Sequence, residues 1–200
     1  MASALKKAMR KDIAQLLSTL TKDEIKMKSD HALIAVQACG VLHKGQKVGI
    51  YVSTDGEIIT DGFIDLLFSM NKDVYIPNFK RGQPDMAFVR LTQSEWKAGL
   101  PSTLWNIRQH EDVDPSQLLD SPLDLLLMPG VAFAANEDRT IKRLGHGAGY
   151  FDRFLHQHEE KYGRLPYLVG LALREQLVRS VPLEDHDVSL NRLIVEQTVI

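Results

Sequence analysis

The stretch from Arg143 to Asp152 carries the side chains best suited to chemistry. Glycines alternate at positions 145, 147 and 149, and a helical pattern begins directly after them. Glycine lets backbone amides approach phosphate oxygens without a Cβ atom in the way, and a helix start adds a favourable dipole. Arg143 can pair with a phosphate, the carboxylate of Asp152 can bind Mg²⁺, and the rings of Tyr150 and Phe151 offer a flat surface. The stretch therefore indicates a phosphate-binding loop beside a metal ligand.

This glycine pattern differs from the common nucleotide-binding motifs. The chain has no GxxxxGK run followed by Ser or Thr, and no six-residue GxGxxG run, so neither a P-loop nor a dinucleotide fingerprint applies. Taken alone, GxGxG is equally typical of a structural turn that leads into a helix. The flanking residues Arg143, Tyr150, Phe151 and Asp152 favour the phosphate-binding interpretation.

Strand and helix signals alternate along the chain and show which elements would position this loop. Helical spacing predicts helices over residues 4–20, 63–70 and 150–162. A further helix is predicted to begin at the capping box of Thr21 and Glu24 and to run towards Val41. Apolar and β-branched runs predict strands over 47–53, 74–76 (ending at Pro77), 86–91, 123–128, 167–173 and 193–199. We therefore expect an α/β fold: residues 1–200 form a single three-layer domain, with a mostly parallel central sheet flanked by helices.

Ligands in such folds bind beyond the carboxyl ends of the parallel strands. The site is accordingly expected at the loops that follow Val52, Met128 and Leu173. Residues 92–122 are rich in Ser, Thr, Pro and Asp and form the longest stretch without a clear pattern. We expect this stretch to be a surface excursion.

Composition excludes several classes of protein. The 24 Lys and Arg residues nearly balance 26 Asp and Glu, so no overall charge draws the chain to nucleic acid or to an anionic membrane. No run approaches the roughly 18 apolar residues needed to cross a bilayer. Cys39 is the only cysteine, which excludes an internal disulfide and a cysteine-rich zinc site. A cytoplasmic protein without a signal peptide is expected.

The order of residues in RLGHGAGYFDRFL (143–155) closely resembles the signature of the 5-formyltetrahydrofolate cyclo-ligase family, whose typical run is RLGxGxGYYD before a helix. The resemblance is colinear across residues 4–196. It includes the segments 6–10, 51–57, 102–107, 123–133, 171–176, 181–182 and 186–187. A chance glycine-rich turn would not extend over the whole chain.

The resemblance implies a ligase that uses ATP and Mg²⁺ to convert 5-formyltetrahydrofolate, with or without a polyglutamate tail, to 5,10-methenyltetrahydrofolate. Arg143 and Asp152 would be catalytic, and Asp152 and Asp187 would bind the metal. The implied ATP-binding residues are Lys6, Lys7, Arg10, Arg143, Leu144, Gly145, His146, Gly147, Ala148, Gly149, Tyr150 and Phe151. The implied folate-binding residues are Val52, Glu57, Trp105, His146, Gly147, Ala148, Gly149 and Tyr150.

Several of these positions also have plain structural interpretations. The basic residues near the N-terminus have a solvated helix face as the less favoured alternative, and Glu57 has the alternative of a turn residue. Val52 and Trp105 are nearly as well explained as core side chains. His186 beside Asp187 is better explained as a surface pair, and we assign it no catalytic role. We expect a monomer that acts without nucleic acid or membrane.

The implied reaction needs no nucleophile from the protein. The formyl oxygen would attack the γ-phosphate of ATP, and the neighbouring folate amine would then capture the activated carbon as phosphate leaves. Catalysis would depend on positioning and on charge neutralisation. This agrees with a chain that shows no Ser/His/Asp or Cys/His arrangement.

The chain departs from the family pattern at His146 and Ala148, where some members carry basic side chains, and at Phe151, where a tyrosine is typical. One phosphate-binding charge is therefore missing, and His146 or another basic residue could compensate. The same departures motivate a second hypothesis, a folate or nucleotide sensor without turnover. A third is a sugar-phosphate isomerase or acyl-transfer enzyme on a related scaffold, because fold does not determine chemistry.

Overall fold

The computed structural model describes residues 2–103, 106–138, 140–182 and 188–200. Its first half contains α1 (Ala2–Leu17), α2 (Lys22–Ala38), the 3₁₀ turn η1 (Val41–Lys44), β1 (Lys47–Ile50), α3 (Asp61–Ser69), β2 (Asp73–Phe79), β3 (Met86–Leu91) and α4 (Gln93–Ala98). The second half contains η3 (Pro115–Gln117), β4 (Leu125–Met128), β5 (Ala132–Ala135), β6 (Ile141–Leu144), α5 (Tyr150–Tyr162), β7 (Tyr167–Ala172), η4 (Arg174–Gln176), β8 (Arg192–Val195) and β9 (Thr198–Val199).

A seven-stranded sheet forms the centre, in the order β3-β2-β1-β4-β7-β8-β9. The pairs β2–β1, β1–β4, β4–β7 and β7–β8 are parallel, and the edge strands β3 and β9 pair antiparallel. The predicted α/β fold with a mostly parallel sheet is therefore confirmed. The chain places β2 on one side of β1 and β4 on the other, so their carboxyl ends form the switch point where such sheets bind ligands.

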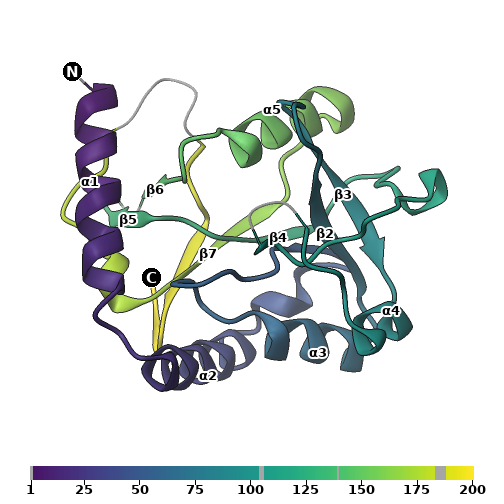
Figure 1. The fold of residues 1–200 in the computed structure, drawn as a ribbon, viewed down its shortest axis with the longest axis horizontal. Coiled ribbons are helices and arrows are strands. Elements are labelled where there is room, and N and C mark those ends of the chain that lie inside the picture. The colour runs from purple at the N-terminus through teal and green to yellow at the C-terminus, as the bar shows by residue number, and fades with distance from the viewer. Residues whose placement is uncertain (1, 104–105, 139, 183–187) are drawn as a thin grey trace.

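Helices cover both faces of this sheet (Figure 1). α2 and α3 pack on one face, where Val36 and Phe63 join a core with β1, β2 and β4. α5 packs on the other face through Phe154 and Leu155. β4 is buried along its whole length, because alternate residues of a central strand point into the two cores.

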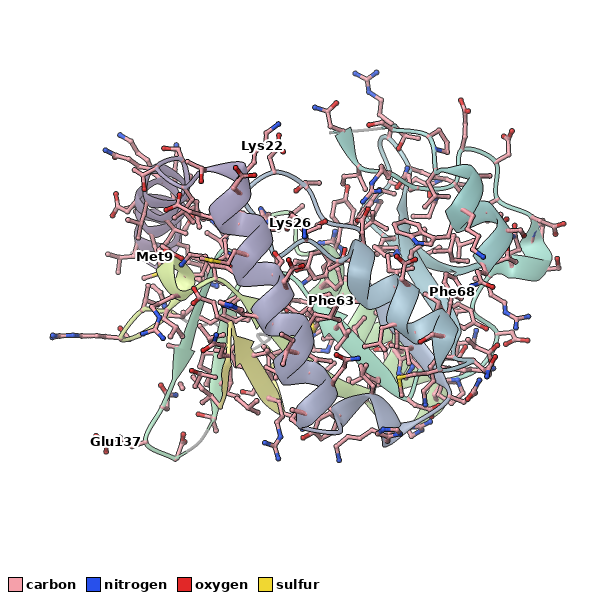
Figure 2. All side chains as sticks on the ribbon, turned by 90° about the horizontal axis from the view of Figure 1, so that it is seen from below. Met9, Lys22, Lys26, Phe63, Phe68 and Glu137 are labelled. Carbon is pink, nitrogen blue, oxygen red and sulfur yellow. The ribbon has the colours of Figure 1, made fainter. Side chains whose placement is uncertain are left out.

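α1 lies apart from these layers, against the small β5–β6 hairpin. Ile13 of α1 packs with Ala132, Ala134 and Leu144 of the hairpin in a third apolar cluster. The tip of the hairpin, near Glu137, extends beyond the body of the molecule (Figure 2). The helix is thereby placed next to the loop that leaves β6.

Several details differ from the sequence predictions, among them the β5–β6 hairpin, which was not predicted. β2 continues through Pro77 to Phe79, although the strand was predicted to end at Pro77. The predicted strand over 193–199 is a hairpin of β8 and β9. Residues 92–122 contain helix α4, which begins at a capping box formed by Thr92 and Glu95. None of the described helices is long and apolar enough to span a membrane.

Candidate active site

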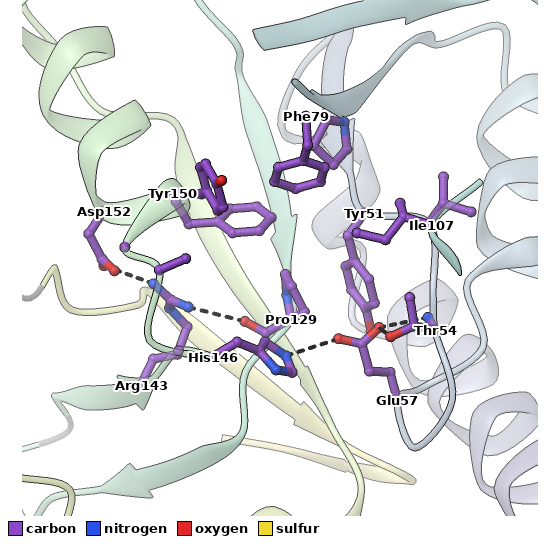
Figure 3. Close-up of a pocket in the computed structure, with 16 residues that line it drawn as sticks. Tyr51, Thr54, Glu57, Phe79, Ile107, Pro129, Arg143, His146, Tyr150 and Asp152 are labelled. Carbon is purple, nitrogen blue, oxygen red and sulfur yellow. Dashed lines mark hydrogen bonds and ion pairs between the residues drawn. The ribbon is translucent and has the colours of Figure 1, made fainter. Parts of the chain in front are cut away.

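A pocket of about 500 Å³ opens at the switch point of the sheet (Figure 3). One wall is formed by the loop after β1, the end of β2 and Ile107, and the other by Pro129 and the segment from Arg143 to Asp152. Its volume lies within the roughly 300–1,000 Å³ that is typical of small-molecule sites. The lining residues show that the loops after Val52 and Met128 reach the pocket as expected, whereas the loop after Leu173 is not part of its lining.

The glycine loop owes its course to two positive φ angles and one close approach. Gly147 and Gly149 have φ angles of 109° and 69°, values that residues with a side chain rarely adopt. At Gly145, an added Cβ atom would lie 3.0 Å from the Nη1 atom of Arg143. The loop then enters α5, whose N-cap Gly149 has no side chain to bond the first amides.

The start of α5 faces the pocket, because Tyr150, Phe151 and Asp152 all line it. The first backbone N–H groups of a helix have no partner within the helix, and the helix dipole favours negative charge there. Ala148 is exposed at the same place. The first turn of α5 and the loop before it can therefore receive an anion.

Arg143 and Asp152 form an ion pair at the base of this wall. The Nη2 atom of Arg143 lies 2.8 Å from Oδ1 of Asp152, and Nη1 donates to the carbonyl of Pro129 at 3.4 Å. The side chain of Arg143 is only 4% exposed, compared with 20% for Asp152. The two residues that the family resemblance makes catalytic are thus one coupled pair, with the carboxylate nearer to solvent.

The basic residues of α1 differ in their surroundings. Arg10 donates from Nε to the carbonyl of Gly145 at 2.8 Å, and its guanidinium lies beside Gly147. Lys6 is buried and Lys7 is exposed. Arg10 therefore contacts the glycine loop directly, although none of the three lines the described pocket wall.

Glu57 faces this loop from the opposite wall. It ends a turn that begins at Thr54, and Gly56 supplies the positive φ of 83° within it. Its Oε2 atom accepts hydrogen bonds from the backbone N–H of Thr54 at 2.8 Å and from the Thr54 hydroxyl at 3.0 Å. Its Oε1 atom lies 3.3 Å from Nε2 of His146, a contact that crosses the mouth of the pocket.

Tyr51 lies beneath Glu57 and is held as a neutral phenol. Its hydroxyl donates to the carbonyl of Ile58 at 3.2 Å. Burial, and secondly the charge of Glu57, raise the pKa of Tyr51 well above its usual value of 10.0. This side of the pocket therefore combines one carboxylate with an apolar and aromatic surface.

An aromatic wall closes the pocket beside α5. The rings of Phe79 and Tyr150 meet edge to face, with centroids 5.0 Å apart. Tyr150 also donates to the carbonyl of Gln83 at 3.3 Å, which joins the β2–β3 turn to α5. Phe79 was not predicted as a site residue, because β2 was expected to end before it. The other unpredicted lining residues include Tyr51, Thr54 and Ile107, whose sequence context does not distinguish them from ordinary loop or core residues.

Two predicted site residues, Trp105 and Asp187, lie outside the described residues. Val52 lines the pocket although it is only 4% exposed. Leu144, which the resemblance implies in ATP binding, packs in the apolar cluster under α1 instead of lining the pocket. Within the described ranges, no group of three or more His, Cys, Asp or Glu side chains is placed to hold a metal ion.

Comparisons with known proteins agree over nearly the whole chain. A probable 5-formyltetrahydrofolate cyclo-ligase of Caenorhabditis elegans is 36% identical over 200 residues, covering 98% of this chain and 95% of the relative. The 5-formyltetrahydrofolate cyclo-ligase of Mus musculus is 31% identical over 198 residues, covering 98% and 96%. The NMR structure of Aquifex aeolicus 5,10-methenyltetrahydrofolate synthetase has the same fold, with a TM-score of 0.76 at 23% identity over 98% of this chain and 91% of that one.

The family model described as the 5-formyltetrahydrofolate cyclo-ligase family matches residues 2–196. This range includes the glycine loop, the Arg143–Asp152 pair and the Glu57 turn. The chain belongs to the 5-formyltetrahydrofolate cyclo-ligase family.

Proposed function

We propose that this chain converts 5-formyltetrahydrofolate to 5,10-methenyltetrahydrofolate, with cleavage of ATP to ADP and phosphate. Family membership supports the reaction, and one observation carries it to this chain: a single pocket has two chemically different walls. One wall offers an exposed loop, an uncapped helix start and a buried cation to phosphates. The opposite wall offers a carboxylate within an apolar and aromatic surface to a polar heterocycle. A pterin with its formyl group would thus lie next to the γ-phosphate.

The chain's own groups would act by orientation and charge. The formyl oxygen attacks the γ-phosphorus as ADP leaves, and the neighbouring folate amine then attacks the activated carbon. Phosphate departs, the amine proton is released, and the methenyl bridge is formed. Backbone amides of the glycine loop and the first turn of α5 would stabilise the negative charge that develops on the phosphoryl group.

Asp152 would hold Mg²⁺ in this arrangement. Mg²⁺ usually takes one or two carboxylates and completes its shell with water and phosphate oxygens, so a cluster of protein ligands is not required. Asp152 lines the pocket with its side chain 20% exposed, and its Oδ1 atom is the one bonded to Arg143. Bound Mg²⁺ would neutralise phosphate charge. Asp187 is proposed as a second ligand from the family resemblance alone.

The decisive experiment is turnover by the purified protein. Incubation with 5-formyltetrahydrofolate, ATP and Mg²⁺ should produce the methenyl absorbance together with one ADP per product. Folate binding without ADP formation would contradict the proposal and favour a sensor. ATP cleavage that is indifferent to folate would contradict it and favour an unrelated activity on this fold.

Other properties are inferred from the sequence and remain proposals. We infer one domain over residues 1–200, which the continuous seven-stranded sheet of the described residues supports. A monomer in the cytoplasm, acting without nucleic acid or membrane, is proposed as well. A substrate with or without a polyglutamate tail is likewise proposed from the family resemblance.

A further inference from the structure

Two hydrogen bonds from Thr54 hold the Glu57 carboxylate in one orientation. Both hydrogen bonds from Thr54 converge on Oε2, at 2.8 Å from the backbone N–H and 3.0 Å from the hydroxyl. The side chain of Glu57 is only 10% exposed. A glutamate that loses its rotamer freedom on binding would weaken affinity, so a carboxylate fixed in advance is a better receptor.

The fixed orientation leaves Oε1 directed to the mouth of the pocket. The contact of Oε1 with His146, at 3.3 Å, joins it to a side chain that is 61% exposed. Because the His146 side of this contact reaches solvent, the contact contributes less to stability than one between two buried groups. A ligand N–H group can therefore displace His146 and take its place at Oε1.

The frame of the turn does not depend on the Thr54 hydroxyl. Ser53 and Thr60 exchange hydrogen bonds, with Ser53 N–H donating to the Thr60 hydroxyl at 3.0 Å and Thr60 N–H donating to the Ser53 hydroxyl at 3.2 Å. Ile59 N–H donates to the Ser29 hydroxyl at 2.9 Å, which joins the turn to α2. The Thr54 hydroxyl is thus free to serve the carboxylate without being needed to hold the loop.

From this geometry we propose that Thr54 is a positioning residue for folate binding, acting through Glu57. It fixes Oε2 so that Oε1 is presented to the pterin N–H donors. The inference rests on the proposed function, because it takes the pterin as the ligand of Glu57. It goes beyond that function by assigning a role to a residue that neither the glycine motif nor the family resemblance singled out.

The test compares Thr54→Val, which removes the hydroxyl, with Thr54→Ser, which keeps it. Thr54→Val should raise the KM for 5-formyltetrahydrofolate roughly five- to tenfold, the effect of losing one of two positioning bonds to a carboxylate. The KM for ATP and kcat should stay within about twofold of wild type, and Thr54→Ser should restore the folate KM. Thr140→Val is the matched control, because Thr140 donates an equivalent pair of bonds to Asp138 away from the pocket.

A double-mutant cycle separates positioning from direct contact, since Thr54 itself lines the pocket. In a Glu57→Ala background, Thr54→Val should not change folate affinity further, measured as the equilibrium Kd. A further loss there would overturn the inference, because Thr54 would then bind the ligand directly. Equal increases in both KM values with a lower thermal midpoint would overturn it as well, in favour of a purely structural role.

The outcome also separates this inference from the proposed function. If wild-type protein forms the methenyl product and Thr54→Val retains the wild-type folate KM, the inference is wrong and the function stands. A wild-type protein without turnover would contradict the function and, with it, the pterin as the ligand of Glu57.

Discussion

Replacing Asp152 by Asn removes one charge from the Arg143–Asp152 pair while keeping an acceptor oxygen. Hydrogen bonds that involve a charged group contribute about 1.5–3 kcal/mol, and Arg143 stays charged in this variant. Exchanging the carboxylate for a neutral amide oxygen should move the bond from the upper to the lower end of that range, a loss of about 1–1.5 kcal/mol. Asp152 also lies in the first turn of α5, where a negative charge contributes about 0.3–1 kcal/mol. The free energy of unfolding should therefore fall by roughly 1.3–2.5 kcal/mol. For a chain of this size, the thermal midpoint should drop by roughly 3–10 °C.

The same variant tests the proposed magnesium site. Activity should depend on a divalent cation in wild type, and Asp152→Asn should lower activity by roughly tenfold or more at limiting Mg²⁺, since one charged ligand is lost. Higher Mg²⁺ should recover part of the loss. The assay is a magnesium titration of methenyl formation at a temperature at least about 10 °C below the thermal midpoint of the variant.

Glu160→Gln provides the matched control, because it replaces an exposed carboxylate by an amide on the same helix. It should leave both the thermal midpoint and the magnesium titration unchanged. An Asp152→Asn protein with wild-type stability would refute the energetic reasoning about the ion pair. Lower stability with an unchanged magnesium titration would show that Asp152 supports Arg143 but does not bind the metal.

Three further predictions test other parts of the site and the fold. Glu57→Gln should raise the Kd for 5-formyltetrahydrofolate about tenfold and leave the Kd for ATP nearly unchanged; equal losses for both ligands would contradict the assignment of Glu57 to the pterin. Ala148→Lys should tighten ATP binding by about two- to fivefold, because residue 148 lines the pocket. The thermal midpoint should not change, because residue 148 is exposed and the new cation stays solvated. A lower midpoint would show that residue 148 has a packing role. Burial lowers the pKa of His158, whose Nε2 atom accepts a hydrogen bond from Leu123 N–H. Below about pH 6.5 the histidine therefore binds a proton in the unfolded chain but stays neutral in the native state. Stability should consequently fall from pH 6.5 to 5, and urea unfolding of His158→Gln should show a smaller fall; an unchanged pH dependence would refute this assignment.

The order of strands and helices could be predicted because apolar residues recur at strand or helix spacing, and Gly and Pro mark the ends of the elements. The central strand β4 is a nearly continuous apolar run before Pro129, and α5 follows three closely spaced glycines. Each signal is local, so a reading of the sequence alone recovers it. The β5–β6 hairpin was missed because its strands, AFAA and IKRL, are rich in alanine and basic residues, and its stability comes from packing against α1.

The continuation of β2 through Pro77 has a topological reason. The pairing of β2 with β1 ends at Tyr75, so beyond that residue the described strands flank β2 only on the β3 side. Proline is tolerated where a strand has an open edge, because its missing N–H is not needed there. The sequence does not reveal where a neighbouring strand ends. It is this extension that brings Phe79 to the pocket.

Contacts across the pocket could not be predicted from the sequence, because they depend on the order of strands in the sheet. Glu57 and His146 lie 89 positions apart, and only the placement of β1 beside β4 brings them together. The motif identified the glycine loop as a unit, but it could not show that Arg143 is paired with Asp152 within that unit. Long-range partners depend on the sheet order, which local patterns do not specify.

The positions of the basic residues bear on the charge that the loop lacks at Ala148. His146 is directed to Glu57 on the opposite wall, so its imidazole contacts a carboxylate and not the loop amides. Arg10 instead donates from Nε to the Gly145 carbonyl and lies next to Gly147, so its guanidinium accompanies the loop amides. A fixed cation behind backbone amides strengthens their attraction for an anion without contacting it. These positions favour Arg10, supplied by α1, over His146 as the residue that compensates for the missing charge.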